Sequence, residues 1–65
     1  MQNPIAALTA FRAKVQALHA EAMVLDIEHG MDADGAFEDA ARGLADTLAD
    51  VDRALTSPAL AMAAE

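Results

Sequence analysis

The chain has 65 residues, enough for one domain with a small core, and oligomerisation commonly completes a core of this size. It contains no cysteine, which excludes disulfides and thiolate metal sites. Eleven acidic and 4 basic residues give a net charge of −7, and this charge disfavours nucleic-acid partners because their affinity rests on Lys and Arg.

The first predicted helix spans residues 4–29. Asn3 is a good N-cap, and Pro4 suits the first helical position because its backbone lacks an N–H that would need a partner there. No Gly or Pro interrupts the segment before Gly30. We expect Gly30 to end this helix in the left-handed conformation.

The second predicted helix spans residues 34–56. Either Asp32 or Asp34 is expected to cap this helix. The carboxylate of Glu38 in the first turn interacts favourably with the positive end of the helix dipole. Ser57 and Pro58 then form another cap-and-start signal. Residues 57–65 are therefore expected to form a short helical turn or a frayed tail.

The two helices carry matching heptad patterns. Apolar positions are spaced alternately four and three residues apart in both halves, and the positions pair so that each pair of residue numbers sums to 66, as Val15 does with Val51. An antiparallel helix pair produces this pattern. We therefore predict an all-α, single-domain antiparallel hairpin of residues 1–65, with a core of Leu8, Phe11, Val15, Leu18, Ala22, Leu25, Phe37, Ala41, Leu44, Leu48, Val51 and Leu55.

The first helix carries a second apolar stripe on its opposite side. A helix that is apolar on two sides is normally covered on two sides, so the stripe predicts a partner interface. Alanine as helix filler explains residues 10–20 equally well, and a rotated seam that buries the stripe and exposes Leu8 or Leu18 is a further alternative. The predicted interface comprises Ala13, Ala17, Ala20, Met23, Val24, Ile27 and Met31.

Two near-equal helices joined by the turn Met31-Asp32-Ala33-Asp34 resemble the plasmid repressor-of-primer family of small helical hairpins. The resemblance covers the layout of both helices and the residues of the turn. It implies that two hairpins pair into a four-helix bundle. That family binds paired RNA loops through polar and basic residues, for which this chain offers only Arg12, Lys14 and Gln16. The surrounding acids depart from the family pattern, so we expect no nucleic-acid binding.

No combination of residues predicts catalysis, a cofactor site or a metal site. Asp26 and His29 have a spacing that can chelate a metal, but the predicted core has no inward carboxylate on the second helix to complete a site. His29 is instead expected beside the negative end of the first helix, where it shields Phe37. The chain also lacks a membrane-length apolar segment and a signal-peptide pattern, which predicts a small cytoplasmic protein of bacterial or phage type.

The leading functional hypothesis is a non-enzymatic interaction module. The hairpin would self-associate, as a homodimer or higher assembly, or dock on another protein as an accessory or regulatory subunit. The alternative is an acidic decoy or inhibitor of phage or plasmid type. It would cover a basic surface of a partner with the carboxylates of Glu38, Asp39, Asp46, Asp50 and Asp52. RNA binding ranks last, and no membrane partner is expected.

Overall fold

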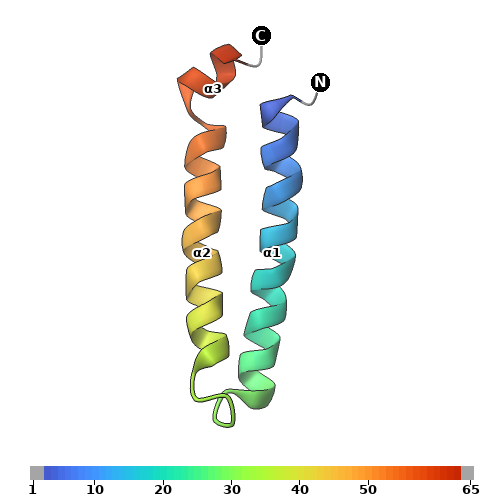
Figure 1. Ribbon diagram of the computed structural model, residues 1–65, viewed down its shortest axis with the longest axis vertical. Helices are drawn as coiled ribbons and strands as arrows, with labels where there is room; N and C mark the ends of the chain where they lie inside the picture. Colours follow the sequence, from blue (N-terminus) through green and yellow to red (C-terminus); the bar gives the residue numbers. More distant parts are fainter. Residues whose placement is uncertain (1–2, 64–65) are drawn as a thin grey trace.

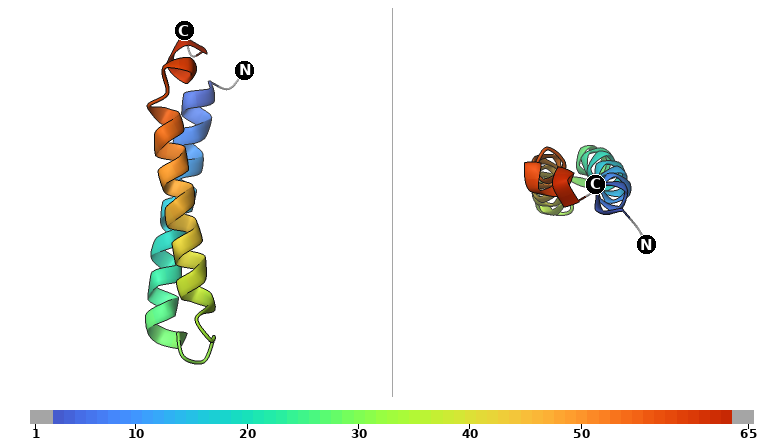
Figure 2. Two further views of the ribbon diagram at one scale, coloured as in Figure 1. Left: turned by 90° about the vertical axis from the view of Figure 1, so that its left-hand side faces the viewer. Right: turned by 90° about the horizontal axis from the view of Figure 1, so that it is seen from above.

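The computed structural model describes residues 3–63 as three helices: α1 (Pro4–His29), α2 (Ala36–Leu55) and α3 (Pro58–Ala63) (Figure 1). α1 and α2 run antiparallel and side by side, and the short α3 contacts both of them at the open end (Figures 1 and 2). The predicted all-α hairpin with a short C-terminal helical turn is therefore confirmed. No helix within residues 3–63 is both long and apolar enough to cross a membrane.

The hairpin is a rod with little interior. Its principal extents are 49 × 18 × 12 Å, and its radius of gyration is 14.8 Å. A compact chain of this length would have a radius of gyration of about 11 Å. Two helices side by side enclose only the line along which they touch, so most residues keep some contact with solvent.

The start of α1 follows the prediction. The Asn3 side chain accepts a hydrogen bond from the backbone N–H of Ile5 at 2.8 Å, and Pro4 occupies the first helical position. The end of α1 does not follow it, because Gly30 is right-handed, with φ −53° and ψ −44°. A Cβ at Gly30 would collide with the backbone oxygen of Asp26. The glycine at this position is thus required by space rather than by a left-handed backbone.

The chain reverses through two left-handed residues, Asp34 (φ 56°) and Gly35 (φ 79°). Asp and Gly are among the residues that tolerate this conformation best. Gly35 is the N-cap of α2 and makes no side-chain cap hydrogen bond, so the prediction that Asp32 or Asp34 caps this helix is wrong. α2 consequently begins at Ala36, two residues later than expected.

The best-buried side chains are Val15 (4% exposed), Ala22 (6%) and Val51 (6%). Phe11 (48%) and Leu18 (52%) depart from the predicted core because they are half-exposed. The reason is a rotation of α1 about its own axis, which turns the line through Val15 and Ala22 directly toward α2. The other predicted core residues are half-buried: Leu8, Leu25, Phe37, Ala41, Leu44, Leu48 and Leu55.

Candidate interaction surface

The outer face of α1 is the side of this helix that α2 does not cover, and its edge at Met23 and Ile27 borders a groove between the two helices. Its exposed fraction rises toward the turn, from 53% at Val24 to 84% at Ile27 and 97% at Met31. The structure thus leaves the predicted second stripe exposed. The rotated-seam alternative holds in part, because Leu18 is half-exposed as it expected, but the stripe does not join the core. Met23, at 49% exposed, lies at the edge of this face. The remaining members of the outer face are all exposed: Ala13, Ala17 and Ala20.

A second apolar surface lies along one flank of the helix pair. We call it the apolar groove. It is an open groove of about 290 Å³, and α1 and α2 both contribute to it. By heptad spacing, the half-exposed Phe11 continues the same flank toward the open end. The residues that line the groove are Leu18, Glu21, Ala22, Leu25, Phe37, Ala40 and Leu44.

The opposite flank holds a groove of mixed character, in which charged side chains lie beside Met23 and Ile27, and we call it the polar groove. It has a volume of about 380 Å³, and charged or titratable side chains enter it from both helices. Within it, Arg42 Nη2 lies 3.2 Å from Glu38 Oε1. Its lining residues are His19, Met23, Asp26, Ile27, Glu38, Ala41, Arg42 and Ala45. The rotation of α1 accounts for this difference, since it brings His19 and Asp26 to one flank and leaves Leu18 and Leu25 on the other.

An ion pair links the two long helices near the open end. Arg12 Nε lies 2.5 Å from Asp52 Oδ1, and Arg12 Nη1 also donates to Gln16 Oε1 at 2.9 Å. The hydrogen bond from Arg12 lowers the pKa of Asp52 below its ordinary value of 3.8, and the same bond raises the pKa of Arg12. Since Arg12 and His19 are one heptad apart, this pair lies on the flank of the polar groove. The sequence analysis did not identify this pair, which joins residues 40 positions apart in the chain.

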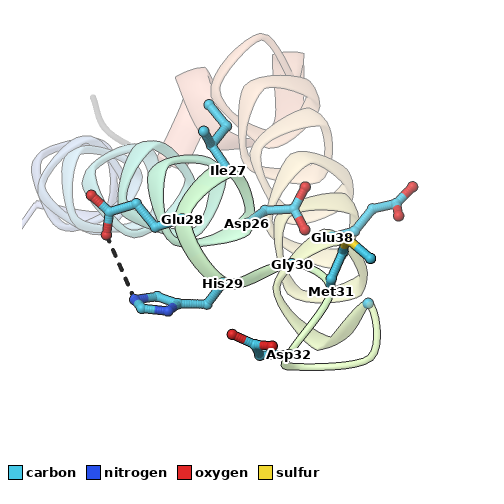
Figure 3. A pocket seen from close by; sticks show the side chains of 9 residues that line it. Asp26, Ile27, Glu28, His29, Gly30, Met31, Asp32 and Glu38 are labelled. Carbon is cyan, nitrogen blue, oxygen red and sulfur yellow. Dashed lines mark ion pairs between the residues drawn. The ribbon is translucent and has the colours of Figure 1, made fainter.

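The turn gathers titratable side chains without assembling a ligand site. His29 Nε2 lies 3.7 Å from Glu28 Oε2, and the His29 ring lies 6.5 Å from the ring of Phe37, beside which it was predicted. No three potential ligands among the described residues come together as a metal site would require. Figure 3 shows why, because four carboxyl groups around the turn point in different directions: those of Asp26, Glu28, Asp32 and Glu38.

The carboxylates of α2 on which the decoy hypothesis rests are partly engaged within the chain. Glu38 pairs with Arg42, Asp50 with Arg53 at 3.2 Å, and Asp52 with Arg12. Three of the five carboxylates are therefore in ion pairs with residues of the same chain. In the same way, the contact with Asp52 engages Arg12, one of the three residues available for RNA.

Comparisons with protein families, with curated proteins and with solved structures find no match for this chain. Its surfaces are therefore interpreted from their own chemistry. That chemistry consists of an exposed apolar face on α1, an apolar groove on one flank of the hairpin and a polar groove on the other.

Proposed function

We propose that this protein is a non-enzymatic interaction module, a helical hairpin that self-associates or docks as a small accessory subunit. The observation that supports the proposal is the exposure of large apolar side chains, which reaches 84% at Ile27 of α1 and 97% at Met31 in the turn that follows it. Exposed apolar clusters of this kind mark protein interfaces. A lone hairpin covers only the side of α1 that meets α2.

The thin core supports the same proposal. Only Val15, Ala22 and Val51 are well buried among the described residues, whereas the half-exposed or exposed large apolar residues of α1 alone outnumber them. Each apolar side chain transferred from water to an interface contributes about 1.5–3 kcal/mol when it is fully buried. Association therefore supplies stabilisation that two helices cannot provide on their own.

The proposal is tested by sedimentation velocity and urea denaturation over a roughly hundredfold range of protein concentration. Assembly stabilises the folded state by mass action, so we expect the unfolding midpoint to rise with concentration. We also expect the sedimentation coefficient to exceed that of a 6.8 kDa monomer. A folded monomer whose midpoint stays constant over the whole range would contradict self-association.

The outer face of α1 is tested by Ile27→Asp. Because Ile27 is 84% exposed in the hairpin, the substitution should leave the helical content of the isolated chain unchanged. A partner protein that covers this face should bind the variant at least about 100-fold more weakly, since a buried carboxylate without a partner is costly. The matched control is Ala49→Asp, at an exposed position of α2.

A further inference from the structure

Building on the proposed function, we propose that the polar groove, together with a hollow beside the turn, is the docking site for a basic amphipathic helix of a partner protein. The hollow has a volume of about 630 Å³. Asp26, Ile27 and Glu38 line both the hollow and the polar groove, so the two form one depression, which we call the trough. Its apolar side chains, its charges and its length all favour this occupant.

The trough presents a row of large apolar side chains that runs along α1 into the turn. Met23, Ile27 and Met31 follow one another at four-residue spacing, and they are 49%, 84% and 97% exposed. On the α2 side, Ala41 and Ala45 are small and leave this row accessible to a partner. Side chains at four-residue spacing form the ridges that pack against another helix, and methionine adapts readily to the surface it meets. The row therefore suits the apolar face of a helix.

The charged side chains of the trough call for bases on the partner. Among the described residues Asp26 forms no ion pair, so a purely apolar partner would bury its carboxylate without compensation. Glu38 is paired with Arg42 at 3.2 Å, and Arg42 is the single Lys or Arg among residues 19–47, which hold eight carboxylates. Lys or Arg on the partner would compensate these carboxylates, and the surrounding negative field would favour the approach of a basic segment.

The length of the trough fits a short helix. Its lining extends along the chain from His19 to Asp32, and about 12 residues of helix span about 18 Å. At the turn, Figure 3 shows Asp26, Glu38 and Met31 on one side of the chain, with Glu28 and His29 on the other. Carboxylates and an apolar side chain thus face the same partner at this end of the trough.

The same charges disfavour other occupants. A nucleic acid carries negative charge, as the trough does, and its affinity would need bases that this half of the hairpin lacks. A second copy of this chain would bring a further net charge of −7. A helix with an apolar stripe flanked by Lys and Arg satisfies both the exposed apolar row and the uncompensated carboxylates.

The probe is a synthetic helical peptide of about 18 residues, with leucine at alternating three- and four-residue spacing and lysine at every other position. One control peptide has glutamate in place of lysine. A second control has the composition of the probe in an order that gives no apolar face. In isothermal titration calorimetry we expect the wild-type chain to bind the probe with a dissociation constant of about 10 μM or less, and each control at least about tenfold more weakly. Binding of the probe should weaken as salt is added.

Paired variants of this chain locate the site. Met31→Ala and Met62→Ala remove the same exposed side chain, one in the trough and one in α3, and we expect only Met31→Ala to weaken binding, by about tenfold. Asp26→Asn and Asp46→Asn each remove one negative charge, and of these two residues only Asp26 lines the trough. We expect a loss of about fivefold for Asp26→Asn and of less than about twofold for Asp46→Asn. All four variants should stay folded by far-UV circular dichroism, because none of these side chains is buried.

The outcomes distinguish this inference from the proposed function. Equal binding of the probe and the control without an apolar face, equal effects within each pair of variants, or no binding of the probe would each overturn the trough as the site. The concentration dependence of the unfolding midpoint then decides the self-association in the proposed function separately. Self-association that Met31→Ala abolishes would identify a second copy as the occupant, which overturns this inference and leaves the interaction module standing.

Discussion

Replacing the same residue type at two positions of one helix tests which side of α1 is covered. Val15 is 4% exposed and faces α2, whereas Val24 is 53% exposed on the outer face. Val15→Ala and Val24→Ala remove the same atoms and change helix propensity equally. The difference between their effects on stability therefore reports burial alone.

The expected magnitudes follow from that exposure. Val15→Ala removes two buried carbons, a loss of about 1.6 kcal/mol at about 0.8 kcal/mol per carbon, and gains about 0.5 kcal/mol from the better helix propensity of Ala. The net destabilisation is about 1 kcal/mol. Val24 is about half exposed, so Val24→Ala loses roughly half of the burial free energy that Val15→Ala loses. The gain in free energy from the better helix propensity of Ala nearly cancels this loss. We expect the Val24→Ala free energy of unfolding to lie within about 0.3 kcal/mol of wild type.

The assay is urea denaturation followed by far-UV circular dichroism, with all three proteins at one concentration so that association affects them equally. With a slope near 1 kcal/mol per molar urea, Val15→Ala should lower the midpoint by about 1 M, and Val24→Ala should leave it unchanged. Equal losses for the two variants would mean that Val24 is as covered as Val15. That result would refute the exposure of the outer face of α1 at Val24.

Four further predictions concern two glycines, the cap of α1 and the ion pair. Gly35→Ala should lower the free energy of unfolding by about 1–2 kcal/mol because φ is 79° there. Gly43→Ala, in the middle of α2 with open space around it, should raise that free energy by about 1 kcal/mol in the same urea titration. Asn3→Ala should lower the free energy of unfolding by about 1 kcal/mol, because it removes the side chain that accepts a hydrogen bond from the backbone N–H of Ile5. It should also reduce amide-exchange protection in the first turn of α1. The pKa of Asp52 is lower in the folded chain than its ordinary value of 3.8, so its ionised carboxylate stabilises the hairpin above pH 3.8. This stabilisation is lost as the pH falls through the lowered pKa of Asp52. Asp52→Asn should therefore destabilise the hairpin less at low pH than at neutral pH. An equal effect at both pH values would contradict a role for the ion pair with Arg12.

Much of the fold was predictable because it depends on local rules and on periodicity. The Asn3-Pro4 start of α1 and the Pro58 start of α3 follow from side-chain capping and from the fixed φ of proline. The heptad spacing predicts two antiparallel helices of nearly the observed lengths. The turn was less predictable, because Gly30 and Gly35 both suit a left-handed position and only Gly35 adopts it.

The candidate site divides in the same way. The outer face of α1 was foreseen, since Val24, Ile27 and Met31 fall on one side of the helix at any reasonable rotation. The apolar groove was not foreseen as a surface, because the sequence analysis placed five of its lining residues in the core: Leu18, Ala22, Leu25, Phe37 and Leu44. Ala40 also lines the groove, but alanine on a helix surface commonly occurs as helix filler and does not by itself indicate a groove.

The sequence by itself determined the helices, their antiparallel pairing and the apolar character of both sides of α1. Tertiary structure decided the rotation of α1 about its axis. The physical reason lies in a difference between the helices. α2 has one apolar side and can face its partner in one way, whereas α1 is apolar on two sides and admits more than one rotation. Packing around Val15 and the contact of Arg12 with Asp52 favour one of them. That rotation brings charged side chains into the groove on one flank of the hairpin and leaves the groove on the other flank largely apolar.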